Sequence, residues 1–166
     1  MKRVVVTILI VSSYIMAVDR PFVVQKSYQF DYDKNTTSLV RHIKVYKEPK
    51  WISKIETRGG KSVYFCSPKS MFEFYFRPGK WFDVGVKSEK DFGNIIVTDY
   101  TTAKLIDAKE AFYIYGSSIT SPAGDDLVAI RDIESAKKFA KEYNGKRILK
   151  FDEVSDALIR LLNGRI

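Results

Sequence analysis

Residues 51–79, WISKIETRGGKSVYFCSPKSMFEFYFRPG, contain the pattern that decides the fold. Apolar and polar residues alternate on both sides of a Gly-Gly pair, which is typical of a β-hairpin with the glycines in its turn. Ser67 and Pro68 suit the cap and the first position of a helix, and a Pro-Gly step after Arg77 ends it. The stretch therefore predicts a hairpin followed by a helix from Pro68 to about Arg77.

The same order of elements returns later in the chain. A strand is predicted over residues 94–100, and residues 107–151 then repeat the strand, turn, strand, helix and closing strand. Asp132 suits the cap of this second helix. The repeat predicts an α+β fold of two ββαβ halves, residues 51–100 and 105–151, whose helices face a shared core.

A last amphipathic helix is predicted over residues 152–164, with Asp152 as its cap, and it completes a domain that spans residues 51–166. Residues 18–50 are polar and irregular, and they predict either two weak strands or a partly ordered arm. His42, the single histidine of the chain, lies in this arm, and we expect it to be a surface or structural residue.

The beginning of the chain is typical of a secretory signal peptide over residues 1–17. Lys2 and Arg3 precede an apolar run that is too short to cross a membrane comfortably and that ends at Ala17. The alternatives are a buried strand and an anchor that is not cleaved. Cleavage after Ala17 predicts an exported, periplasmic protein that begins near Val18.

The composition indicates a folded basic protein and no nucleic-acid partner. Hydrophobic residues make up 45% of the chain and charged residues 29%, and the formal net charge is +8. Lysines and arginines are scattered rather than gathered into a block, and no nucleic-acid-binding motif is present. We expect the positive charge to meet an acidic protein surface or the headgroups of a membrane.

The sequence predicts that the protein is not an enzyme. It contains no Ser-His-Asp set, no plausible Cys-His pair and no glycine-rich phosphate loop. Acidic residues follow strands or occupy turns, where aspartate side chains commonly bond to nearby backbone amides; these are Asp99, Asp107, Asp125 and Asp126.

Cys66, the only cysteine, ends a predicted strand one position before a helix cap. The partial positive charge at a helix N-terminus favours a thiolate, and a thiolate with a nearby thioether is a donor set that suits Cu(I). Met71 lies five residues further on. The alternative is a small buried cysteine beside a core methionine. Cys66 and Met71 are therefore candidate metal ligands, and we predict Cys66 to be accessible at the mouth of a pocket.

From Trp51 to Phe151 the chain resembles the NosL family, the copper-handling accessory proteins of nitrous-oxide reductase assembly. The likeness is carried by KSVYFCSPKSMFEFYF (61–76), VTDY (97–100), IDAKEAFYIYGS (106–117), SPAGDDLVAI (121–130) and GKRILKFDEV (145–154). The resemblance implies the fold of two related halves already inferred from the repeat. It also implies copper as the cargo and an assembly protein as the partner.

This sequence departs from the family pattern at the usual soft ligands. No lipid-bearing N-terminal cysteine and no Cys-Gly-Met element precede the first hairpin, and Ala123, Gly124 and Asp125 occupy the Met-Gly-His-like turn of the second half. Two hypotheses follow: a periplasmic accessory protein that passes copper to a partner through Cys66 and Met71, or a metal-free interaction module on the same scaffold.

Overall fold

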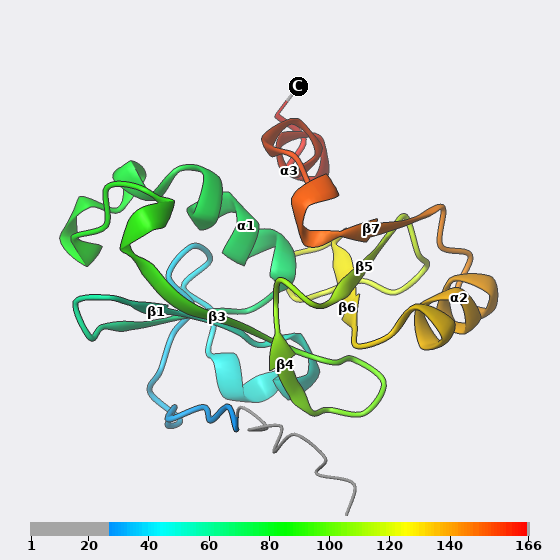
Figure 1. The fold of residues 1–166 in the computed structure, drawn as a ribbon, viewed down its shortest axis with the longest axis horizontal. Helices are drawn as coiled ribbons and strands as arrows, with labels where there is room; N and C mark the ends of the chain where they lie inside the picture. The colour runs from blue at the N-terminus through cyan, green and yellow to red at the C-terminus, as the bar shows by residue number, and fades with distance from the viewer. Residues whose placement is uncertain (1–26, 166) are drawn as a thin grey trace, which may run out of the picture.

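The computed structural model describes residues 27–165. The first half begins with a hairpin, continues with a helix and ends with a long strand that returns to the hairpin (Figure 1). A short strand then adds to the edge of the sheet. These elements are β1 (Ser53–Thr57), β2 (Ser62–Phe65), α1 (Pro68–Phe76), β3 (Phe92–Thr98) and β4 (Leu105–Asp107). The antiparallel sheet has the order β2-β1-β3-β4.

The second half repeats this topology with one strand fewer. Its elements are β5 (Phe112–Tyr115), β6 (Leu127–Ile130), α2 (Ile133–Glu142) and β7 (Arg147–Lys150). The sheet order is β6-β5-β7, so the first strand of each half is central and is flanked by its hairpin partner and by the strand after the helix. The predicted α+β fold of two ββαβ halves is confirmed.

The local signals place both helices correctly. The Ser67 hydroxyl accepts a hydrogen bond from the backbone N–H of Ser70, and the Asp132 carboxylate accepts one from that of Ser135. In the first hairpin, Gly60 has a φ of 82°, a left-handed conformation that glycine adopts without a steric penalty.

The strand predicted from residue 107 onward differs from the structure. The chain turns where Asp107 accepts a hydrogen bond from the backbone N–H of Lys109. As a result β4 pairs with the first sheet, and β5 opens the second sheet after the turn. The predicted strand therefore joins the last residue of an edge strand of one half to the central strand of the other.

The C-terminal helix is shorter than predicted, and Asp152 is not its cap. Residues Phe151–Glu153 form a 3₁₀ turn, η6, in which the Glu153 carboxylate accepts a hydrogen bond from the backbone N–H of Lys150. The helix α3 spans Asp156–Leu162, and the Ser155 hydroxyl caps it by accepting from the N–H of Leu158. The buried, extended Val154 separates the two elements.

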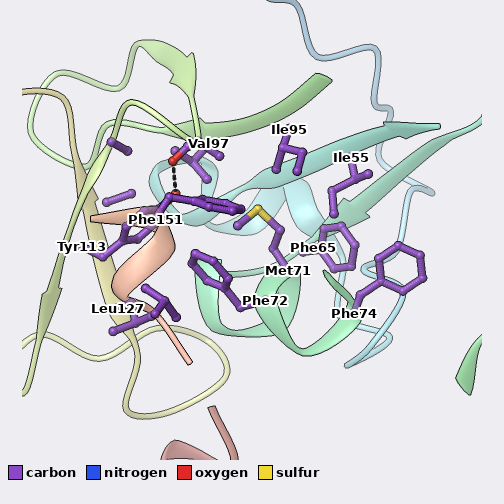
Figure 2. Close-up of a cluster of buried hydrophobic side chains, with 14 of the residues drawn as sticks. Ile55, Phe65, Met71, Phe72, Phe74, Ile95, Val97, Tyr113, Leu127 and Phe151 are labelled. Atoms are coloured by element: carbon purple, nitrogen blue, oxygen red, sulfur yellow. Dashed lines mark hydrogen bonds between the residues drawn. The ribbon is translucent and has the colours of Figure 1, made fainter. Parts of the chain in front are cut away.

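The main core lies between the first sheet, α1 and the second sheet. It contains Phe72 from α1, Tyr113 from β5 and Phe151 after β7, and the Phe72 ring lies 5.1 Å from the Tyr113 ring and 4.9 Å from the Phe151 ring, centroid to centroid (Figure 2). The prediction that both helices face this core is wrong for α2. Its Phe139 packs in a separate cluster on the other side of the second sheet, with Trp51 among its members.

The N-terminal segment is an ordered part of the domain over the residues that the structure describes. It contains one isolated bridge and two 3₁₀ turns, η1 (Val45–Lys47) and η2 (Pro49–Trp51). Its aromatic residues cover the face of the first sheet opposite α1, where the Phe30 ring lies 5.8 Å from that of Tyr64. There the buried Lys54 ammonium donates to the Gln29 carbonyl at 2.8 Å.

Three further 3₁₀ turns connect α1 to β3: η3 (Pro78–Lys80), η4 (Phe82–Val84) and η5 (Glu89–Asp91). Within residues 27–165, no helix has the length and apolar character needed to cross a bilayer. The predicted signal peptide, residues 1–17, lies outside the described residues and stays a prediction.

Phe72→Ala should lower the free energy of unfolding by about 3–5 kcal/mol, because the ring is fully buried among both halves. Phe82→Ala is a matched control: its ring is 86% exposed, so its effect should stay within about 0.5 kcal/mol. Urea unfolding would measure both. Equal losses in the two variants would contradict the shared core.

Candidate functional site

The N-terminus of α1 makes polar contacts with the second half. The carboxylate of Asp126, which precedes β6, accepts a hydrogen bond from the backbone N–H of Lys69 at 2.7 Å. The same carboxylate accepts from the backbone N–H of Leu127 at 2.8 Å and from the hydroxyl of Ser121 at 2.7 Å. A negative group is favoured at this end of a helix by the orientation of the peptide dipoles. We call this contact between α1 and residues 121–126 the seam.

The side chain of Lys69 adds a second connection across the seam. Its ammonium group donates to the Ala123 carbonyl at 2.7 Å and to the Leu162 carbonyl, at the end of α3, at 3.4 Å. Lys69 therefore joins α1 to both the 121–126 turn and the C-terminal helix. Burial lowers the pKa of this ammonium, and the charge of Asp126 opposes that shift.

Glu73, one turn further along α1, binds the C-terminal end of the described chain. Its buried carboxylate pairs with the guanidinium of Arg165 at 2.8 Å and with that of Arg41 at 3.2 Å. It also accepts a hydrogen bond from the Asn163 amide at 2.9 Å. Segments from near both ends of the described range are thereby held on one face of α1, beside the seam.

Cys66 directly precedes the cap of α1 and is buried. The residue is 3% exposed, and its Sγ lies 3.8 Å from the hydroxyl oxygen of Ser70 in the first turn of α1. The prediction that Cys66 is accessible at the mouth of a pocket is therefore wrong. The hairpin and the helix meet closely at this point, and the 121–126 turn packs on the same helix end.

Met71 points into the main core instead of toward the seam. Figure 2 shows its sulfur among Phe65, Phe72 and Ile95, and the residue is fully buried. Cys66 is not a member of this core cluster. The fold thus does not assemble the two sulfurs into one open site. Met71 behaves as a flexible apolar side chain that fills space between aromatic rings.

His42 is exposed in the N-terminal segment, in a turn where its φ of 55° is left-handed. Its backbone N–H donates to the Ser38 carbonyl. Within the part of the chain that the structure describes, no three His, Cys, Asp or Glu side chains gather in a way that could hold a metal ion. His42 therefore fits the surface role predicted from sequence.

Sequence reasoning missed the role of Asp126. Asp99 and Asp107 do form local turns, since they accept from the backbone N–H groups two residues later. Asp126 reaches the backbone of Lys69, 57 residues away. Nothing in the local sequence distinguishes this aspartate from a turn residue, because its partner is supplied by the packing of the two halves.

Comparison with known proteins establishes the family. Residues 29–159 match the NosL sequence profile, which is most of the chain. The chain belongs to the NosL family. The match begins before the first hairpin and so includes the ordered N-terminal segment, which the sequence analysis placed outside the domain.

Two NosL relatives give the extent of the likeness. The copper-binding lipoprotein NosL of Stutzerimonas stutzeri is 29% identical over 106 residues, 64% of this chain and 54% of the relative. The chain thus matches about half the length of that protein. The crystal structure of the copper chaperone NosL from Shewanella denitrificans superposes with a TM-score of 0.67 at 22% identity, covering 80% of this chain and 99% of the other. At that identity the superposition shows a shared fold.

The buried carboxyl of the seam should make stability depend on pH. Removal from water raises the pKa of Asp126, and the hydrogen bonds from Ser121 and the neighbouring groups offset this only in part. The folded protein therefore binds this proton more tightly than the unfolded chain, whose aspartate pKa is about 3.8. Relative to Asp126→Asn, the wild-type free energy of unfolding should rise as pH falls from 7 toward 4.

Comparison with Asp132→Asn should show the opposite dependence of the free energy of unfolding on pH. Hydrogen bonds from Ser135 lower the pKa of the exposed Asp132, so its contribution should be constant above pH 4 and lost below it. Urea titrations at several pH values would compare the three proteins. If the difference in free energy of unfolding between the wild type and Asp126→Asn stays constant or decreases as pH falls from 7 to 4, the raised pKa of Asp126 is contradicted.

Proposed function

We propose that this protein is a non-catalytic accessory protein in copper handling. The observation that carries the proposal is the NosL match over residues 29–159, on a fold shared with a copper chaperone. The two relatives are named a copper-binding lipoprotein and a copper chaperone, and neither name refers to a reaction. The described domain accords with such a role, because its polar groups at the seam are engaged in structural hydrogen bonds.

Cys66 is the proposed soft donor for Cu(I). A thiolate beside a helix N-terminus is favoured electrostatically, and Cu(I) binds well to a small number of sulfur ligands. Because Cys66 is buried, loading requires the fold around it to open, and we propose that the contact between α1 and the 121–126 turn is the part that opens. Met71 remains the proposed second sulfur, and it reaches the ion only if α1 moves relative to the first sheet. A partner's sulfur would otherwise complete the site.

The proposed setting is the periplasm, and the proposed recipient is a copper enzyme such as nitrous-oxide reductase. The predicted signal peptide, residues 1–17, supports export. The name lipoprotein, given to the relative from Stutzerimonas stutzeri, accords with a protein that works at a membrane. The partner would then be a periplasmic or membrane-associated assembly protein, and peripheral contact with the membrane is part of the same proposal.

A metal-free interaction module is the second candidate function. Both described sulfurs are buried, and the Ala123-Gly124-Asp125 turn at the seam carries no soft side chain. In this alternative the scaffold binds a component of the copper-handling machinery, and copper itself is carried by that component.

Competition for Cu(I) against a chromophoric chelator separates the two functions. The protein that begins at Val18 should withdraw copper from the chelator, and Cys66→Ser should abolish this because it removes the thiolate. Met71→Leu conserves volume in the core, so it should weaken binding without unfolding the protein.

Ser70→Ala is the matched control, because it changes the group next to Cys66 and keeps the sulfur. It should bind Cu(I) like the wild type. If all four proteins leave the chelator equally loaded, the copper-donor proposal fails and the metal-free module replaces it.

A further inference from the structure

A cleft of about 350 Å³ lies between the two halves, and none of its lining residues belongs to the seam. One wall is formed by Tyr100, at the turn after β3, together with Lys50 before β1. The other wall is formed by α2, which contributes Lys138, Phe139 and Glu142. Neither sulfur lines this cleft, so its chemistry is separate from the proposed copper site.

Aromatic rings form the apolar part of the cleft. The Tyr100 ring lies 5.0 Å from the buried Trp51 and 5.7 Å from Phe139, and Phe139 lies 4.4 Å from Tyr143, centroid to centroid. Tyr100 and Tyr143 are half-buried, so each presents part of its ring to solvent. Partly exposed tyrosines of this kind are enriched where proteins bind other proteins.

Two ammonium groups at the cleft have no acidic partner among residues 27–165. The Lys50 Nζ lies over the Tyr100 ring, 5.3 Å from its centroid, and Lys138 stands on the opposite wall. Neither takes part in a salt bridge within the described chain. Glu142 is the one carboxylate that lines the cleft. Two ammonium groups against one carboxylate leave a net positive charge there.

The walls are fixed in place before any ligand arrives. The backbone N–H of Tyr100 donates to the Ala129 carbonyl of β6 at 2.9 Å, which ties the turn to the second sheet. The buried Asp99 carboxylate accepts from the hydroxyl of Thr101 at 2.7 Å and from that of Thr102 at 2.8 Å. A rigid cleft loses little conformational entropy on binding.

We propose that this cleft binds a short acidic segment of a partner protein that carries an aromatic or proline side chain. The apolar side chain enters between the Tyr100 and Tyr143 rings, and flanking carboxylates meet Lys50 and Lys138. Aromatic-lined grooves bind proline-containing extended peptides, and unpaired lysines select acidic neighbours.

The shape of the site favours this occupant over a membrane or a nucleic acid. A bilayer surface meets protruding groups, whereas these rings line a hollow. Nucleic acid would require a longer row of cations, and Glu142 would face its phosphates.

Nuclear magnetic resonance titration of ¹⁵N-labelled, copper-free protein tests the proposal. The probe is an end-blocked hexapeptide with a central phenylalanine–proline pair between aspartates, and its counterpart replaces every aspartate with lysine. Only the acidic peptide should shift the amide signals of Tyr100 and Tyr143. Lys138→Glu should weaken its binding on the order of tenfold or more.

Lys137→Glu is the matched control on the same helix, because Lys137 pairs with Glu134 at 2.9 Å and does not line the cleft. Its affinity should stay within about twofold of the wild type. Absence of shifts at the cleft, equal binding of both peptides, or equal losses in the two lysine variants would overturn the proposal. Because the titration contains no copper, its outcome does not depend on the result of the Cu(I) competition.

Discussion

The contact of the Asp126 carboxylate with the N-terminus of α1 is the interaction on which the rest of the structure depends. It brings a charged group from the second half to the helix of the first half, where backbone N–H groups stabilise it. Two further residues of α1 contact other segments: Lys69 binds the 121–126 turn, and Glu73 binds the segment after α3. Because these groups are buried, removing the Asp126 carboxylate leaves the backbone N–H of Lys69 without this acceptor in a place shielded from water.

In this chain of the NosL family, the fold is held by polar contacts while the sulfurs of Cys66 and Met71 are inaccessible. The seam is closed by a carboxylate, a lysine and backbone carbonyls, none of which is a soft ligand. Cys66 is buried next to the cap of α1, and Met71 is part of the core. The proposed copper site therefore needs a local opening of the fold, whereas the aromatic cleft is open to solvent as it stands.

Signals that are local in sequence predicted the local structure. The glycine pair of the first hairpin and the caps Ser67 and Asp132 were sufficient to locate the hairpin and both helices, and the repeat gave the two halves. One local signal failed: Asp152 and Ser155 both suit a helix cap, and α3 begins only after the 3₁₀ turn η6. The other failures depend on long-range packing. The split between β4 and β5 follows from pairing with two different sheets, and the separate packing of α2 follows from the face of the second sheet that it covers. Neither of these is encoded in a short window of residues.

The rate at which an aromatic disulfide reagent modifies Cys66 tests the account most directly. In the native protein we predict a rate on the order of a thousandfold below that of the urea-unfolded chain, because the buried thiol reacts only when the fold around it opens. Asp126→Ala should raise the native rate on the order of tenfold or more by removing the acceptor that closes the seam. A wild-type rate equal to that of the unfolded chain, or an unchanged rate in Asp126→Ala, would contradict the account.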